Sequence, residues 1–223
     1  MLILGIDDAG RGPVIGPMIM AGCLIDDKIE KEFRKLGVKD SKLLQPKKRE
    51  ALAEIIRDKA ITFEVRIIHP AEIDGRDGDG LNLNKIEAIK SAEIINAINE
   101  GFKQMKVIID CPSPNITSWK NYLLKHIEKK DNLIVMCEHK ADRNHIACGA
   151  ASIIAKSTRE AEVQKIKDKL GIDFGSGYTH DPITIKFLKD YHKKYKKDGI
   201  FRETWGTIAN HKAEKEQKKL DSF

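Results

Sequence analysis

Four aspartates occupy positions where their carboxylates could gather around a metal ion. Asp7 and Asp8 end one apolar run, Asp110 ends another, and Asp142 precedes an alanine-rich segment. Acids at the carboxyl ends of strands point into the crevice where open α/β sheets bind ligands. Carboxylates held close together raise each other's pKa values unless a cation neutralises them.

Hard divalent ions such as Mg²⁺ and Mn²⁺ prefer oxygen ligands. Two of them, about 3.5–4 Å apart, can clamp the attacking and leaving oxygens of a phosphodiester. The four acids therefore predict metal-dependent phosphoryl chemistry without naming a substrate. Each acid also has a structural interpretation: Asp142 as a helix cap, Asp110 as a strand end that meets solvent, and the pair Asp7-Asp8 as a strand terminator.

The elements that must position these acids follow from the hydrophobic pattern. Short apolar or alternating runs predict strands at 2–8, 14–25, 61–68, 107–110 and 133–137. Amphipathic periodicity predicts helices at 47–59, 82–99, 116–127, 142–169, 182–197 and 208–220. Hairpin strands come first and strand–helix alternation follows, so the fold class is α/β, with a mixed sheet flanked by helices and a helical C-terminal appendage.

Composition narrows the class of protein. Of the 223 residues, 41% are apolar, which is enough for a core, and 33% are charged. The longest apolar run falls short of the ~18 residues of a membrane span, and the N-terminus lacks a basic leader, so we expect a cytoplasmic protein. The net charge of +6 suits a polyanionic partner. The four cysteines form no C-x-x-C pair, which argues against zinc and for reduced, buried thiols.

A series of motifs supports a specific family. The opening G-I-D-D-A-G-R-G-P at 5–13 closely resembles the signature of the type 2 ribonucleases H (ribonuclease HII), in its archaeal form. The later motifs follow in the family's order: D-S-K-L at 40–43, Asp110, K-A-D at 140–142, A-A-S-I-I-A-K at 150–156, G-S-G-Y at 175–178 and R-E-T-W-G-T at 202–207. The resemblance covers about residues 1–207.

The resemblance implies a ribonuclease H-like fold with a five-stranded mixed sheet. It implies an endonuclease that hydrolyses the phosphodiester 5′ to ribonucleotides, in RNA/DNA hybrids and in DNA duplexes with embedded ribonucleotides. In-line attack of water with two divalent ions, Mg²⁺ or Mn²⁺, would leave 3′-hydroxyl and 5′-phosphate ends. Asp7, Asp8, Asp110 and Asp142 would be both the metal ligands and the catalytic acids. Asp8 stands where the family usually has Glu, and Thr179-His180 replaces a common Pro-Ser.

The same resemblance implies how the substrate is held. Gly10-Arg11-Gly12, otherwise a plain turn, would read the ribose, because glycines allow close approach and the 2′-hydroxyl distinguishes RNA from DNA. Tyr178, otherwise an ordinary core residue, would pack on the sugar beside the cut. Ser41 and Lys42, otherwise solvated loop residues, would contact phosphate. Six lysines and one aspartate between 183 and 197 make a basic helix suited to phosphate positioning.

We expect a monomer with three parts: a catalytic domain at 1–175, a helical subdomain at 176–215 that aids substrate binding, and a tail at 216–223. In the tail, Gln217, Leu220 and Phe223 are spaced as Q-x-x-L-x-x-F, which resembles the peptide by which replication and repair enzymes attach to the DNA sliding clamp. One helical turn would place the two apolar side chains on one face. They could instead dock on the chain's own core.

Four other interpretations are weaker. His139, His145 and His180 lie near the motifs, but no zinc-ligand spacing supports a metal site there. The segment D-G-D-G at 77–80 begins like a calcium loop but has Leu81 at the third ligand position.

A dinucleotide-binding domain would need a glycine at Ile15 and a helix rather than a strand after the turn. A non-catalytic nucleic-acid-binding module would keep convergent acids away from phosphates.

Overall fold

The computed structural model describes residues 1–38, 45–75 and 81–208. Its centre is a five-stranded sheet in the order β3-β2-β1-β4-β5. The strands are β1 (Leu2–Ala9), β2 (Met18–Ile25), β3 (Thr62–Ile68), β4 (Met105–Asp110) and β5 (Leu133–Glu138). β1 pairs antiparallel with β2 and parallel with β4, β2 pairs antiparallel with β3, and β4 pairs parallel with β5, which confirms the mixed sheet.

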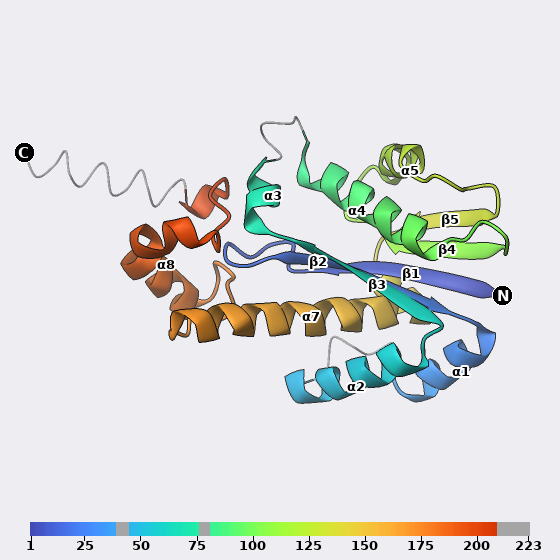
Figure 1. Ribbon diagram of the computed structural model, residues 1–223, viewed down its shortest axis with the longest axis horizontal. Coiled ribbons are helices and arrows are strands. Elements are labelled where there is room, and N and C mark those ends of the chain that lie inside the picture. Colours follow the sequence, from blue (N-terminus) through green and yellow to red (C-terminus); the bar gives the residue numbers. More distant parts are fainter. Residues whose placement is uncertain (39–44, 76–80, 209–223) are drawn as a thin grey trace, which may run out of the picture.

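Helices cover both faces of this sheet. They are α1 (Asp27–Lys35), α2 (Pro46–Lys59), α3 (Pro70–Gly75), α4 (Leu83–Ile98), α5 (Ile116–Lys125), α6 (Ala141–Asn144), α7 (Ile146–Leu170) and α8 (Pro182–Tyr195), with the 3₁₀ turn η2 (Lys196–Asp198). The long α7 lies with α1 and α2 on one face, and α4 and α5 lie on the other (Figure 1).

The alternation of side chains along β1 divides the core into two layers. Ile3 packs in the cluster under α7, whereas Leu4 and Ile6 pack in the cluster under α4 and α5. Because successive strand residues face opposite sides of a sheet, the same alternation directs Asp7 towards α7 and Asp8 towards α4.

The second strand begins later than the sequence predicts. The predicted strand 14–25 starts only at Met18, because the residues before it form a loop that bonds the C-terminal part of the chain. Val14 N–H donates to the Gly177 carbonyl at 2.8 Å, and Gly16 N–H donates to the Ile200 carbonyl at 2.8 Å. The apolar residues of this loop are therefore buried outside the sheet.

Two predicted helices also need correction. The predicted helix 142–169 is broken at His145, whose backbone is extended, into α6 and α7. The predicted helix 182–197 ends as α8 at Tyr195 and continues as η2. Almost all of the predicted helix 208–220, like the segment 77–80, lies outside the described residues.

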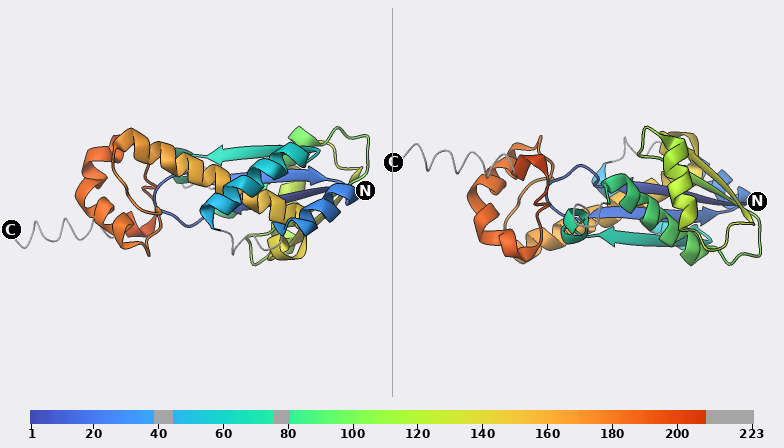
Figure 2. Two further views of the ribbon diagram at one scale, coloured as in Figure 1. Left: turned by 90° about the horizontal axis from the view of Figure 1, so that it is seen from below. Right: turned by 90° about the horizontal axis from the view of Figure 1, so that it is seen from above.

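The C-terminal part of the chain lies at one end of α7, opposite the N-terminus (Figure 2), and has its own apolar cluster. This cluster joins Phe187 and Leu188 of α8 to Val14, Val163 and Phe174. The lysines of α8 and η2 are exposed on the other side: Lys186, Lys189, Lys193, Lys194, Lys196 and Lys197.

Among the residues that the structure describes, no helix is both long and apolar enough to span a membrane. All four cysteines are free; Cys137 is half-buried and the others are buried.

Candidate active site

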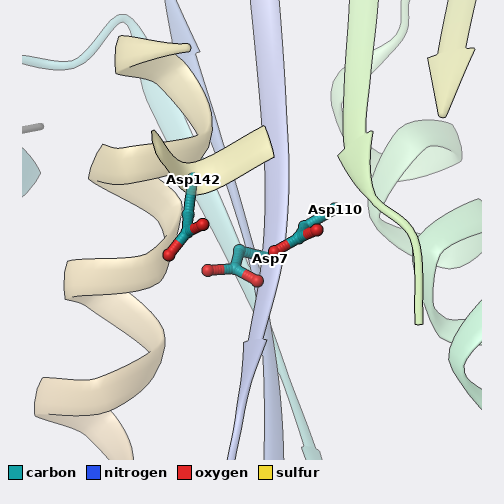
Figure 3. A group of neighbouring side chains, drawn as sticks. All are labelled: Asp7, Asp110 and Asp142. Atoms are coloured by element: carbon teal, nitrogen blue, oxygen red, sulfur yellow. The ribbon is translucent and has the colours of Figure 1, made fainter. Parts of the chain in front are cut away.

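Three of the four aspartates converge at the carboxyl ends of the central strands. Asp7 comes from β1, Asp110 from β4 and Asp142 from α6, and each offers a carboxylate oxygen within 4.8 Å of the others (Figure 3). Asp7 and Asp142 are buried, with 6% and 4% of their surfaces exposed. Because β1 and β4 are parallel neighbours, their carboxyl ends lie at the same edge of the sheet.

A glycine in β1 lets the third acid come close. A Cβ built on Gly5 would lie 2.1 Å from the Ala147 carbonyl carbon and 2.2 Å from the Cys148 nitrogen, in the first turn of α7. The backbone of α7 therefore rests directly on β1. A Cβ on Gly149 would lie 3.2 Å from the Asp142 carbonyl oxygen, so α6 and α7 are also in close contact.

The short helix that carries Asp142 is fixed at both ends. Lys140, which precedes it, has a left-handed backbone with φ 60°, a conformation that costs energy in a residue other than glycine. The Ala141 N–H donates to Asp110 Oδ1 at 3.3 Å. At the other end, Glu138 Oε1 accepts from Asn144 Nδ2 at 3.0 Å and lies 3.0 Å from His145 Nε2.

The electrostatics of Asp7 fit a cation. Burial raises the pKa of this carboxyl well above its usual value, and the neighbouring charges of Asp8 and Asp110 raise it further. The Asp8 amide, which donates to Asp7 Oδ1 at 2.8 Å, and the nearby Ser152 hydroxyl act in the opposite direction. A hard divalent cation would relieve this repulsion, and the donor set of carboxylate oxygens is the one such ions prefer.

The remaining aspartate, Asp8, lies in a different environment. Burial raises its pKa to about 7, helped by the charges of Glu87 and Asp110 and opposed by those of Arg11 and Lys156. Glu87 belongs to α4, the face to which the alternation of β1 directs Asp8.

The residues expected to read ribose line one cleft. Gly10, Arg11, Gly12 and Tyr178, together with Asp8, border a space of about 450 Å³. A Cβ on Gly12 would lie 3.6 Å from the Tyr178 ring, so the glycine and the tyrosine face each other closely.

The Arg11 side chain is tied to α4, because its Nε donates to Glu87 at 2.9 Å and its Nη2 to Asn84 at 2.6 Å. Ser41, Lys42 and the tail residues Gln217, Leu220 and Phe223 lie outside the described residues.

The same cleft holds two basic residues of α7 for which the sequence suggested no role. Lys156 and Arg159 both line it. The Arg159 guanidinium lies 5.0 Å from the centre of the Tyr178 ring, and its Nη2 donates to the Ser176 carbonyl at 3.0 Å. The i, i+3 spacing of these two residues puts them on one face of a helix, which is the signal that could have identified them.

The histidines have structural partners instead of a shared metal. His139 Nδ1 lies 2.9 Å from the Cys111 carbonyl oxygen, His145 is paired with Glu138, and His180 lies against the Tyr178 ring. In the described part of the chain, the group of potential metal ligands consists of aspartates alone.

A mixed five-stranded sheet with carboxylates at the ends of its central strands is the arrangement of the ribonuclease H fold. The chain belongs to the ribonuclease HII family: the model of the family described as Ribonuclease HII matches residues 4–208. It is thus a type 2 ribonuclease H, and enzymes of this family depend on divalent metal ions.

Full-length relatives support this assignment. Ribonuclease HII of Pyrococcus furiosus is 38% identical over 228 residues, which cover 100% of this chain and 98% of the relative. The crystal structure of the ribonuclease H2 of Pyrococcus horikoshii superimposes with a TM-score of 0.85 at 37% identity and covers 96% of this chain and 98% of the other. A structure of the complex of PCNA with RNase HII from Archaeoglobus fulgidus gives a TM-score of 0.80 at 38% identity, covering 92% and 95%.

Proposed function

We propose that this ribonuclease H cuts the phosphodiester 5′ to a ribonucleotide, both in RNA/DNA hybrids and at ribonucleotides embedded in duplex DNA. Hydrolysis leaves a 3′-hydroxyl and a 5′-phosphate. The observation that carries the proposal is the convergence of Asp7, Asp110 and Asp142 within 4.8 Å, close to a cleft that contains Gly10–Gly12 and Tyr178.

The proposed metal ligands are Asp7, Asp110 and Asp142, with Asp8 completing the set for two Mg²⁺ or Mn²⁺ ions. When bound, these ions supply positive charge to the phosphate oxygens and lower the pKa of water. The burial of Asp7 and Asp142 keeps their carboxylates in place and limits competing solvent.

The chain's own residues would select the substrate. In the proposed complex, the Gly10–Gly12 backbone approaches the ribose closely and bonds its 2′-hydroxyl, while Tyr178 packs on the same sugar. Ser41 and Lys42 contact phosphate.

The division into a catalytic domain at 1–175 and a substrate-binding subdomain at 176–215 is likewise a proposal. The separate apolar cluster of α8 and its exposed lysines support it, because lysines on one face of a helix suit phosphate contacts.

The decisive assay uses a DNA duplex that carries one ribonucleotide, incubated with Mg²⁺, Mn²⁺ or EDTA. We expect a single nick on the 5′ side of the ribonucleotide with either metal, and none with EDTA. Asp7→Asn should lower the rate by about 10³-fold or more, because it removes a charged ligand from the reaction centre. The exposed Asp58 of α2 provides the matched control, since Asp58→Asn should cut normally.

The same two variants test the metal site without catalysis. Mg²⁺ or Mn²⁺ should raise the melting temperatures of the parent protein and of Asp58→Asn, because an ion that binds the folded state stabilises it. The melting temperature of Asp7→Asn should rise much less. Substantial nicking by Asp7→Asn, or cleavage in EDTA, would reject the assignment of these acids.

We further propose that the tail binds a DNA sliding clamp through Gln217, Leu220 and Phe223. The likeness to an RNase HII that was solved in complex with PCNA supports this proposal, as does the Q-x-x-L-x-x-F spacing. A clamp would carry the nuclease along newly made duplex DNA.

A further inference from the structure

Arg202 is fully buried, and its guanidinium binds the loop that contains Gly10–Gly12. Its Nη2 donates to the Gly10 carbonyl at 2.6 Å, its Nη1 to the Arg11 carbonyl at 2.9 Å and its Nε to the Gly16 carbonyl at 3.1 Å. A buried cation is costly unless polar groups surround it closely. Here the surrounding groups include three backbone carbonyls of a single loop, so the shape of this loop contributes to compensating the charge.

The residues around Arg202 hold the same loop. The Trp205 ring lies 5.6 Å from the Arg202 guanidinium carbon, and the Trp205 Nε1 donates to the Pro13 carbonyl at 2.6 Å. Phe201 forms a β-bridge with Ile15. The C-terminal segment 200–205 therefore packs against the inner side of the loop.

The geometry of the peptide unit determines what this does at the cleft. In a planar trans peptide, the carbonyl of one residue and the N–H of the next point in opposite directions, and these peptide bonds are trans. Because the carbonyls of Gly10 and Arg11 point to the buried Arg202, the N–H groups of Arg11 and Gly12 point away from it. Gly10, Arg11 and Gly12 also line the cleft, which is the open space beside this loop.

We propose that Arg202 is a positioning residue for ribose recognition: by binding the two inner carbonyls it turns the Arg11 and Gly12 amides towards the sugar. This inference rests on the proposed function, in which the loop backbone reads the 2′-hydroxyl. Arginine suits the task because its planar fork presents several N–H groups at fixed angles, whereas lysine presents one ammonium.

The test compares the binding of two duplexes that differ in one 2′-hydroxyl: DNA with a single ribonucleotide, and the same duplex all in DNA. Affinities are measured by fluorescence anisotropy with Ca²⁺ in place of Mg²⁺, on the full chain. The dissociation constant for the all-DNA duplex, divided by that for the ribonucleotide duplex, reports ribose recognition. We expect Arg202→Lys to lower this ratio by about tenfold, in line with the effect of misplacing a recognition group. Affinity for the all-DNA duplex should stay within about twofold, because phosphate contacts dominate it.

Two further variants separate positioning from general stability. Trp205→Phe keeps a ring over the guanidinium but loses the bond to Pro13, so it should lower the ratio less than Arg202→Lys does. In Arg202→Ala, millimolar guanidinium chloride should restore part of the ratio, because the ion can refill the site. The exposed Arg34 of α1 provides the control, and Arg34→Ala should show the parent ratio with and without guanidinium.

Each outcome bears on one of the two proposals. An unchanged ratio in both Arg202→Lys and Trp205→Phe, with lowered melting temperatures, would show that Arg202 only stabilises the fold and would overturn the inference. Equal losses of affinity for both duplexes would overturn it too. If the parent protein itself binds both duplexes equally, or if Gly12→Leu leaves the ratio unchanged, the proposed ribose readout fails instead. If Arg202→Ala does not fold, the other two variants decide the question.

Discussion

At the scale of single residues, the neighbouring acids Asp7 and Asp8 differ because a strand turns alternate side chains to opposite faces. Asp7 faces α7 and meets Asp110 and Asp142, whereas Asp8 interacts with Glu87 on α4. A longer side chain at position 8 would extend its carboxylate further from the β1 backbone. The glutamate usual in the family has that extra methylene.

We therefore predict that Asp8→Glu keeps or raises the activity. The added reach should let the carboxylate complete the metal site, so the Mg²⁺ concentration at half-maximal rate should fall or stay the same. The measurement is kcat/KM on the single-ribonucleotide duplex across a Mg²⁺ titration, with Asp58→Glu as the surface control. A loss of more than about tenfold would show that the site is built around the shorter acid.

The contact between Gly12 and Tyr178 leads to a prediction about selectivity. Tyr178→Ala removes the ring that the sugar would pack on. Gly12→Leu adds a side chain whose Cβ would already lie 3.6 Å from that ring, so it fills the space between them. Each should lower the preference for the ribonucleotide duplex over the all-DNA duplex by about tenfold or more, since loss of one specific contact has that size of effect. Competition binding measures this preference; unchanged selectivity in both variants would place the ribose readout elsewhere.

The sequence predicts part of this site and misses another part for a physical reason. Residue type and position at strand ends suffice to find Asp7 and Asp110. Arg202, by contrast, belongs to a visible motif, but arginine is seldom fully buried. Nothing local indicates that the side chain would turn inward, because its partners are carbonyls almost two hundred residues earlier in the chain.

At the scale of elements, the packing of α7 on β1 sets the distance between the acids. The sequence predicts both elements, but not how closely they approach, because Gly5 reads in sequence as an ordinary strand glycine. The break at His145 was missed for a related reason. The polar residues that end α6 bind Glu138 of β5, so a contact between distant segments stops a helix that local propensity would continue.

Gly5→Ala should therefore damage both stability and activity. Its Cβ would lie 2.1 Å from the backbone of Ala147, so α7 must move away from β1. We expect a loss of about 1–3 kcal/mol in the free energy of unfolding. That corresponds to a fall of roughly 2–12 °C in melting temperature for a chain of this size.

Cleavage should fall at least about tenfold at a temperature where the variant is folded, because a small misplacement of Asp142 affects the reacting geometry. Gly75 of α3 has nothing within 4 Å of a built Cβ and provides the control, so Gly75→Ala should leave both properties near their parent values. Equal melting curves for Gly5→Ala and the parent would contradict the proposed close approach.

At the scale of the whole molecule, the residues proposed to bind the substrate lie where the sheet meets the C-terminal helices. The loop before β2 lines the proposed substrate cleft and also hydrogen-bonds to the segment 200–205. The sequence predicts a helical appendage, and periodicity is enough for that. The sequence could not show that Val14 and Ile15 belong to the apolar cluster of the appendage, because an apolar run next to a strand is predicted to continue that strand.

The last prediction concerns attachment of the whole enzyme to a clamp through the tail. Leu220 and Phe223 are three residues apart, the spacing of one helical turn, and would present two apolar side chains to a groove on the partner. Gln217 could both donate and accept hydrogen bonds at the edge of this groove. Truncation after Glu216 removes all three at once. Leu220→Ala with Phe223→Ala removes only the apolar contacts, which dominate this kind of recognition.

Calorimetric titration with the sliding clamp of the same source should therefore show binding by the intact chain and none by the truncated chain. The double variant should bind at least about a hundredfold more weakly, as expected when two buried anchors are lost. Lys218→Ala, between Gln217 and Leu220, is the matched control and should bind nearly as well as the parent. Cleavage of a short duplex without the clamp should be equally fast in all four proteins, because the tail would contact the clamp and not the substrate. Equal binding by intact and truncated chains, or no binding by the intact chain, would refute the assignment of the tail.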